Sequence, residues 1–240
     1  VLADSSVSTL ALGYDAWIPA EGAEVTRNFG ESNVKLDISE IAESIEYSGI
    51  ELDYILFDAC FMSNIEAVYD LRNSAKYIIA SPCEIMGKGF PYHRTLPHLF
   101  GESYNLRSAA ESYYLFYLDE YNGSARCGSV ALYDCAEVEA LAEATKLVMQ
   151  SANLDIDTSM LQTYEGQAVH HFYDFGEWVR SVATDSEALK AFDEQLNRTV
   201  IAKFTLPTFY SAYGSYGTYN INEEVYSGVT TSAPSEAYPQ

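Results

Sequence analysis

Cys60 is the residue of this chain whose type and position best fit catalytic chemistry. It follows the apolar run DYILFD at residues 53–58, which is typical of a strand buried on both faces, and it precedes a predicted helix at residues 64–73. A thiol at such a junction lies near unpaired backbone N–H groups and the positive end of the helix dipole, which favour the thiolate. The pattern fits a cysteine nucleophile, although an inert, buried cysteine fits the same position.

The other cysteines, Cys83, Cys127 and Cys135, indicate neither a metal site nor a disulfide framework. The sequence has no C-x2-C pair and no His at ligand spacing, so no zinc site is predicted. A Cys127–Cys135 bridge is an open alternative, but the residues between them are predicted to form a strand, which would hold the two apart. Thiol chemistry needs no cofactor, and no EF-hand-like spacing supports a calcium site.

The elements that position Cys60 are predicted from apolar runs and helical spacing. Strands that alternate with helices predict an α/β fold with a mostly parallel central sheet and helices on both faces. Functional groups of such sheets gather at the carboxyl ends of the strands, here at residues 13–17, 58–62 and 81–91. We predict strands at residues 9–13, 53–58, 77–81 and 129–134, helices at 38–47, 64–73, 108–121, 136–150, 170–182 and 186–203, and loops at 14–33, at 81–93 and, with one or two short strands, from Thr208 onward.

The composition is that of an acidic globular protein. Hydrophobic residues make up 48% of the chain and no Pro/Gly/Ser-rich linker divides it, so we expect a single domain over residues 1–240. The formal net charge of −22 argues against nucleic acid and anionic membranes as partners, because both bind Lys/Arg patches. No apolar run reaches the roughly twenty residues that span a membrane. The acidic surface keeps the protein soluble or, alternatively, attracts basic peptides or divalent cations.

One long block resembles the central part of the clostripain-like cysteine peptidases. The block is DYILFDACFMSNIEAVYDLRNSAKYIIASPCEIMGKGFPY, residues 53–92. In that family a strand ends in Asp-Ala-Cys, an acidic helix follows, and an IIAS strand leads to a Gly-Phe-Pro-Tyr loop. The similarity continues through SVALYDCAEVEALAEA and HHFYDFGEWVR, and so covers most of the chain. The first segment of the family is missing, and since the chain opens without an initiator Met, we expect sequence upstream of Val1.

The resemblance implies a caspase-like fold, an αβα sandwich, in which a Cys/His dyad cuts peptides after Arg or Lys. Cys60 would be the nucleophile. Asp58 would stand near the pocket for the residue before the cut, where a buried carboxylate can pair with a basic side chain; alternatively, Asp58 caps the turn between strand and helix. Relatives are often secreted or cell-envelope (periplasmic) proteins that act on peptides or proteins, and some use calcium.

The sequence departs from the family at the general base, a His in a Ser-His-Gly step at the end of the preceding strand. Residues 13–17 read GYDAW here and hold no His. A base must come within hydrogen-bond reach of the thiol or the leaving group. The remaining histidines, His93, His98, His170 and His171, are predicted to be structural or surface residues, with His93 the nearest to a strand-end loop.

A second departure is Lys88, which stands where the family commonly has an acidic residue that completes the basic-specific pocket. A lysine inside that pocket would repel Arg or Lys and weaken the preference for basic residues. The alternative is that the side chain of Lys88 simply points into solvent.

Three hypotheses follow from these residues. The first is a secreted cysteine endopeptidase whose base is omitted from this chain. The second is an inactive pseudopeptidase that serves as a peptide- or protein-binding module, because both the base and the acidic pocket residue are missing. The third is an acidic adhesion module that binds proteins or glycans through a tyrosine-rich surface, since the chain holds 20 Tyr.

Overall fold

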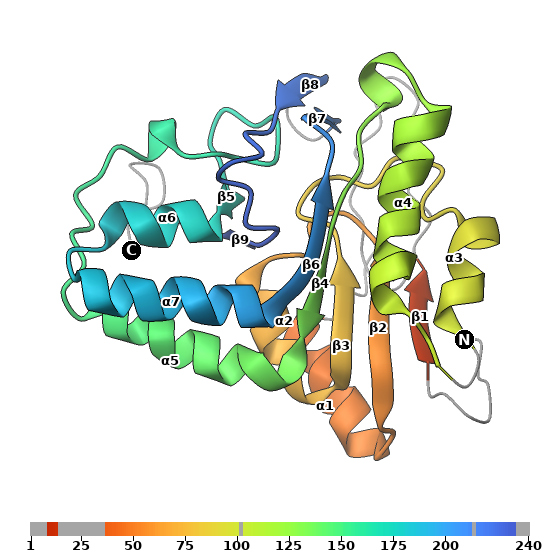
Figure 1. Ribbon diagram of the computed structural model, residues 1–240, viewed down its shortest axis with the longest axis horizontal. Coiled ribbons are helices and arrows are strands. Elements are labelled where there is room, and N and C mark those ends of the chain that lie inside the picture. Colours follow the sequence, from red (N-terminus) through yellow and green to blue (C-terminus); the bar gives the residue numbers. More distant parts are fainter. Residues whose placement is uncertain (1–8, 14–36, 101–102, 213–214, 234–240) are drawn as a thin grey trace.

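A five-stranded sheet forms the centre of the computed structural model, which describes residues 9–13, 37–100, 103–212 and 215–233 (Figure 1). The strand order is β1-β2-β3-β4-β6. The apolar runs of the sequence are those expected of the central strands, because strands in the middle of a covered sheet are buried on both faces. The strands are β1 (Thr9–Gly13), β2 (Leu52–Asp58), β3 (Ala75–Ala80), β4 (Ser129–Asp134) and β6 (Val200–Thr205).

The described sheet is mixed, which corrects the expectation of a mostly parallel one. The pairs β1–β2 and β2–β3 are parallel, whereas β3–β4 and β4–β6 are antiparallel. Two helices, α3 (Tyr92–Leu99) and α4 (Leu106–Glu120), separate β3 from β4 in sequence. Because two helices return the chain to the edge where β3 ended, β4 runs in the opposite direction (Figure 1).

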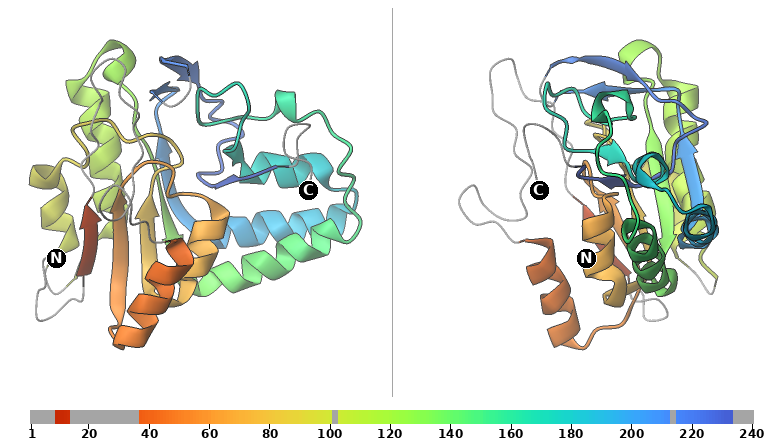
Figure 2. Two further views of the ribbon diagram at one scale, coloured as in Figure 1. Left: turned by 180° about the vertical axis from the view of Figure 1, so that it is seen from behind. Right: turned by 90° about the vertical axis from the view of Figure 1, so that its left-hand side faces the viewer.

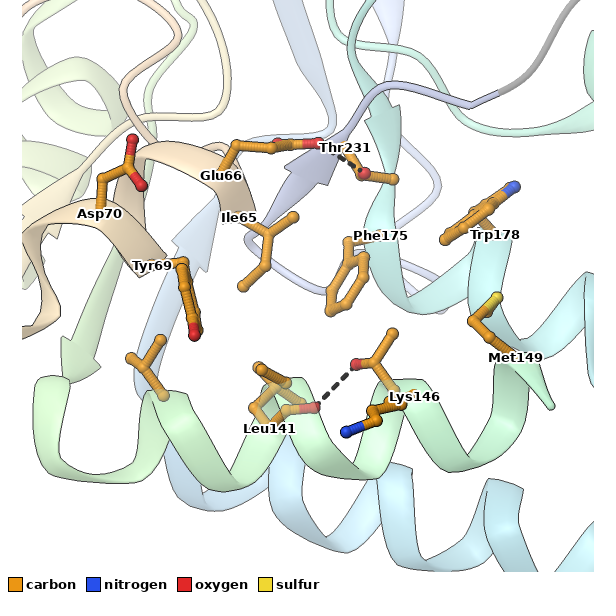
Figure 3. A pocket seen from close by; sticks show the side chains of 13 residues that line it. Ile65, Glu66, Tyr69, Asp70, Leu141, Lys146, Met149, Phe175, Trp178 and Thr231 are labelled. Carbon is orange, nitrogen blue, oxygen red and sulfur yellow. Dashed lines mark hydrogen bonds between the residues drawn. The ribbon is translucent and has the colours of Figure 1, made fainter. Parts of the chain in front are cut away.

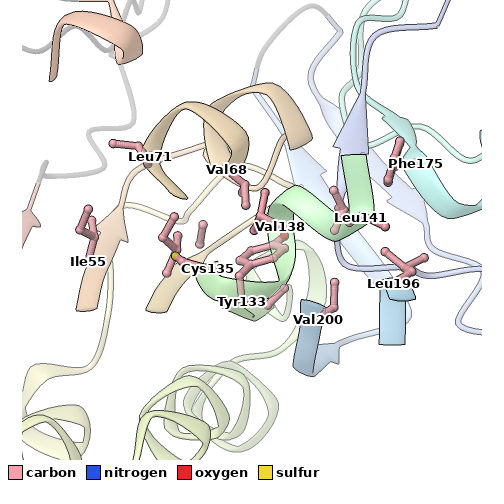
Figure 4. Close-up of a cluster of buried hydrophobic side chains, with 14 of the residues drawn as sticks. Ile55, Val68, Leu71, Tyr133, Cys135, Val138, Leu141, Phe175, Leu196 and Val200 are labelled. Carbon is pink, nitrogen blue, oxygen red and sulfur yellow. The ribbon is translucent and has the colours of Figure 1, made fainter. Parts of the chain in front are cut away.

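Helices cover both faces of the sheet, as predicted (Figures 1 and 2). The side chains of β2 alternate between two cores. Tyr54 and Leu56 join the core on the face that α3 and α4 cover, while Ile55 and Phe57 join a first core on the opposite face. Figure 4 shows part of the first core. The helices on that face are α1 (Ile38–Ser48), α2 (Ile65–Asp70), α5 (Val138–Met149), α6 (Phe175–Val182) and α7 (Ser186–Thr199).

Short elements complete the described chain. A hairpin of β7 (Thr208–Ser211) and β8 (Gly217–Asn220) lies apart from the pair β5 (Tyr173–Asp174) and β9 (Thr230–Thr231). None of the described helices is long and apolar enough to cross a membrane. Turns of 3-10 helix occupy Leu71–Asn73, Gly123–Ala125, Cys135–Glu137 and Thr158–Met160.

Most predicted elements are confirmed, but two helices, the loop at 81–93 and the region from Thr208 need correction; the described part of that region contains three short strands, β7, β8 and β9, rather than one or two. The predicted helix at 170–182 begins only at Phe175, because Asp174 caps it by accepting from the Glu177 amide. The predicted helix at 186–203 ends at Thr199, where the run VIAKFT of β6 takes over. The first residues of β6 alternate between buried and exposed, which is the two-residue period of a strand. The predicted loop at 81–93 ends at Pro91, because α3 begins at Tyr92, and the predicted loop at 14–33 lies outside the described residues.

Candidate active site

Cys60 lies just beyond the carboxyl end of β2, where its thiol is half-buried and meets the loop that follows β3. The backbone N–H of Ile85 points at the sulfur, with 3.2 Å between nitrogen and Sγ. The thiol in turn lies 3.8 Å from the carbonyl oxygen of Ile85. The N–H donor stabilises negative charge on the sulfur and by itself favours the thiolate, whereas the more distant carbonyl oxygen accepts from the thiol and favours the protonated form.

The donor at 3.2 Å lies in the loop after β3, and the influence of the helix that follows Cys60 on its thiol stays a prediction. The N-cap of that helix is Asn64, whose side chain accepts from the Ala67 amide at 2.7 Å. The N–H group that reaches the sulfur comes from Ile85. Sequence reasoning missed this group because a backbone amide has no signature in the residue type.

The residue after Cys60 adopts an unusual backbone conformation. Phe61 has φ of 60°, and it is the one non-glycine residue in the described chain with positive φ. This left-handed conformation is disfavoured for an aromatic residue and is typically held by its surroundings. Here the Phe61 amide donates to the Cys83 carbonyl at 3.2 Å, and the Ser63 amide donates to the Ser81 carbonyl at 3.1 Å. The turn thus fastens the Cys60 loop to the end of β3.

Asp58 is buried and holds the Gly-Phe-Pro-Tyr segment, residues 89–92, against the end of β2. One carboxylate oxygen accepts from the Phe90 amide at 3.2 Å, and the other accepts from the Tyr92 hydroxyl at 2.9 Å. Gly89, with φ of 64°, passes so close that a Cβ atom there would lie 2.7 Å from Oδ2 of Asp58. Asn64 caps the helix, and the choice between the two roles considered for Asp58 from sequence stays a prediction.

Helix α4 supports the same segment from its other side. The Tyr117 hydroxyl donates to the Gly89 carbonyl at 2.9 Å, and the rings of Tyr113 and Phe90 lie 4.4 Å apart between centroids. Burial raises the pKa of Tyr117 well above its ordinary value, so the hydroxyl stays a protonated donor. The segment at residues 89–92 is therefore clamped between β2 and α4.

Two charged residues lie on the loop between Ser81 and Gly89. Lys88 is exposed in a turn closed by the Gly89 amide, which donates to the Met86 carbonyl at 2.8 Å. Glu84 is half-buried, and its carboxylate accepts from the Ala212 amide at 2.8 Å. Glu84 is an acidic residue of this loop that the sequence-based prediction did not select.

The histidines occupy two separate parts of the described chain. His93 and His98 belong to α3, where the His93 ring packs edge-on against Phe116. His170 lies in a loop, with Nδ1 3.2 Å from the carboxylate of the buried Glu165. Most of residues 13–17, where the family carries its base, fall outside the described chain.

The remaining cysteines are buried and free. Burial raises the pKa of Cys127 to about 11 and that of Cys135 to about 12, and it raises the pKa of Cys83 well above its ordinary value. These thiols therefore stay protonated at neutral pH. Within the described ranges, no group of three or more His, Cys, Asp or Glu side chains could hold a metal ion.

An apolar groove of about 520 Å³ opens beside α2, and Cys60 is not among the residues that line it (Figure 3). It lies between α2, α5, α6 and β9, with Leu141 and Phe175 on its floor and Glu66 held at its edge by the Thr231 hydroxyl at 3.1 Å. The residues that line the groove include no cysteine and no histidine. Its lining residues are Ile65, Glu66, Tyr69, Asp70, Val138, Leu141, Ala142, Thr145, Lys146, Met149, Phe175, Trp178 and Thr231.

Comparisons with known proteins point to one family. The model of the Clostripain family, peptidase C11, matches residues 13–230. A clostripain from Bacteroides thetaiotaomicron, solved with the peptide inhibitor BTN-VLTK-AOMK, is 34% identical with a TM-score of 0.79; the match covers 88% of this chain and 92% of that one. A search of curated sequences found no significant match.

Two further solved structures belong to chains that extend well beyond the matched part. A secreted C11 cysteine protease from Bacteroides thetaiotaomicron is 33% identical with a TM-score of 0.78, and the match covers 93% of this chain but 65% of that one. An inactive zymogen C11 protease from Parabacteroides distasonis is 30% identical with a TM-score of 0.74, with 84% and 57% covered. This chain thus spans less than two thirds of these two relatives.

Proposed function

Because this chain belongs to the clostripain family of cysteine peptidases, we propose that it is a secreted endopeptidase that cuts peptide bonds with the thiol of Cys60. One observation carries the proposal. Cys60 is half-buried at the carboxyl edge of the sheet with the Ile85 amide directed at its sulfur, whereas the other cysteines are buried. Solved relatives described as secreted support the localisation. We take residues 1–240 as a single domain of this kind.

The reaction proposed is acyl transfer through a thioester. The Cys60 thiolate attacks the scissile carbonyl carbon, and the C–N bond breaks as the leaving amine takes a proton. Water then cleaves the thioester, which releases the acid and restores the thiol. Backbone N–H groups hold the oxyanion, and that of Cys60 is the first candidate. The general base is proposed to come from outside residues 13–17, since that stretch holds no His.

We propose a preference for a basic residue before the cut, with Asp58 as the acidic group that recognises it. Its carboxylate is buried beside the Cys60 turn, and a negative charge in such surroundings attracts a cationic side chain more strongly than one in water. A relative binds a peptide inhibitor whose sequence is VLTK, which fits this preference. Lys88 weakens this preference for basic residues, because its positive charge lies on the neighbouring loop even though the side chain is exposed.

The second candidate function is a pseudopeptidase that binds peptides without cutting them. The missing His at residues 13–17 favours it, and so does the use of Asp58 as a clamp for residues 89–92. In this alternative the sheet edge keeps its shape but has no base to activate Cys60.

Covalent labelling separates the two candidates. The protein is treated with an Arg- or Lys-based acyloxymethyl ketone, with Cys60→Ala as the negative control and Cys135→Ala, which removes a buried thiol, as the matched control. We expect labelling of the native and Cys135→Ala proteins, and none of Cys60→Ala. If neither basic nor neutral probes label the native chain, the pseudopeptidase is the correct interpretation.

A further inference from the structure

A pair of stacked aromatic rings joins the Cys60 loop to a distant part of the chain. The centroids of the Phe61 and Phe172 rings lie 4.5 Å apart, and the ring planes are 3° from parallel. Phe61 follows Cys60 directly, whereas Phe172 lies just before β5. Both side chains are half-buried, so the contact sits at the edge of the site rather than deep in a core.

The backbone of Phe61 needs such support. Its φ of 60° is a conformation that residues with a Cβ atom rarely adopt, and relaxation to negative φ would rotate the peptide group that joins it to Cys60. That rotation would draw the sulfur away from the Ile85 amide, which is 3.2 Å distant. The stacked ring of Phe172 opposes the rotation because it fixes the direction of the Phe61 side chain.

Phe172 is itself held in place by its neighbours. Its carbonyl accepts from the Tyr164 amide at 3.0 Å. The preceding residue, His171, donates its amide to Oε1 of the fully buried Glu165 at 2.7 Å. A hydrogen bond from a backbone amide to a buried carboxylate is among the stronger ones in proteins, so the segment at residues 164–172 is a firm base for the ring.

We propose that Phe172 is a positioning residue for the Cys60 thiol, because its ring holds the left-handed turn at Phe61 that keeps the sulfur against the Ile85 amide. Glu165 acts one step further back by anchoring the segment that carries the ring. The inference rests on the proposed function in that Cys60 is taken as the nucleophile. Its test reads thiol reactivity directly and does not require peptide cleavage.

The test measures alkylation of Cys60 by iodoacetamide in the full chain, resolved by peptide mass spectrometry, as a function of pH. We expect Phe172→Leu to slow alkylation about three- to tenfold, since loss of a stacked pair changes the equilibrium between the held and the relaxed turn by up to about tenfold. The midpoint of the pH profile should also move upward, because the thiolate loses the Ile85 donor. Phe172→Tyr, which keeps the stack, should stay within about twofold of the native rate.

The matched control is Tyr114→Leu. Tyr114 of α4 stacks on Phe204 of β6 with 5.9 Å between ring centroids, so this variant loses a stacked aromatic pair that joins other elements. Its alkylation rate and pH midpoint should equal those of the native protein. Thermal unfolding of every variant shows that the fold is retained, which separates positioning from general loosening.

A double-mutant cycle tests the route through Phe61. If the ring of Phe172 acts on Cys60 through the ring of Phe61, Phe172→Leu should have no further effect in a Phe61→Leu background. Glu165→Gln keeps an oxygen that accepts from His171 but loses the charge, so it should slow alkylation less than Glu165→Ala does. An equal or faster rate in Phe172→Leu, or equal slowing in Tyr114→Leu, would overturn the proposal. Absence of ketone labelling, by contrast, refutes only the peptidase proposal.

Discussion

Replacing Gly89 with alanine should destabilise the protein far more than the same change at a glycine with similar backbone and open surroundings. Gly89 has φ of 64°, and an added Cβ atom would lie 2.7 Å and 2.9 Å from the two carboxylate oxygens of Asp58. Real Cβ atoms do not approach so closely, and Asp58 is buried and hydrogen-bonded, so it cannot swing away freely. The change therefore adds a collision to the ordinary cost of positive φ.

The expected magnitude has two parts. The left-handed conformation costs a residue with a Cβ atom about 1–2 kcal/mol relative to glycine. Moving the Asp58 carboxylate breaks at least one of its bonds to the Phe90 amide and the Tyr92 hydroxyl, and a hydrogen bond to a charged group is worth about 1.5–3 kcal/mol. The free energy of unfolding should fall by about 3–5 kcal/mol in total.

Urea denaturation measures this loss, with Gly123→Ala as the control. Gly123 has φ of 62° and nothing within 4 Å of an added Cβ, so its substitution should cost only about 1–2 kcal/mol. In an Asp58→Ala background the two substitutions should cost the same, because the obstructing carboxylate is gone. Equal losses for Gly89→Ala and Gly123→Ala in the native background would refute the reasoning.

Further predictions concern thiols, charge and helix capping. Burial raises the pKa of Cys127 from 9.0 to about 11 and that of Cys135 from 9.0 to about 12. The contribution of these thiols to stability is therefore complete below pH 9 and is lost as the pH rises toward the raised values. Urea denaturation at about pH 8 and about pH 10 checks this, and the loss of stability should be smaller when both residues are alanine. Lys88→Asp should raise kcat/KM for Arg peptides about two- to fivefold, and leave stability unchanged, as steady-state assays and unfolding would show. Asn64→Ala should cost about 1 kcal/mol of unfolding free energy, because the Ala67 amide loses its cap; no loss would contradict the assigned cap.

Elements with a strong local pattern can be predicted from the sequence. The strands at Thr9–Gly13 and Ser129–Asp134 have the predicted bounds, because short apolar runs between turn residues have few alternatives. The start of β6 is missed because the helical spacing of α7 leads into it without a break. The reversed direction of β4 depends on how α3 and α4 fold back, which no local pattern encodes.

The candidate site, too, can be predicted from the sequence only in part. Side-chain chemistry at one position is legible in sequence, and so Cys60 and Asp58 can be selected as candidates. The groups that contact the Cys60 turn cannot be predicted from the sequence. The Ile85 amide belongs to the backbone, and the ring of Phe172, which stacks on Phe61, comes from a segment far away in sequence. The roles of Cys60 and Asp58 in catalysis and specificity stay predictions.

The structure also constrains how specificity can be studied. Asp58 holds the segment at residues 89–92 through Phe90 and Tyr92, so any substitution of Asp58 changes the shape of the pocket wall together with its charge. Loss of cleavage after Arg in such a variant would not distinguish recognition from structure. Tyr92→Phe removes one donor and keeps the carboxylate, so the negative charge is no longer shared with that hydroxyl. If Asp58 recognises a basic side chain, Tyr92→Phe should strengthen the preference for Arg and Lys over neutral residues in kcat/KM; if Asp58 is only a clamp, that ratio should not rise.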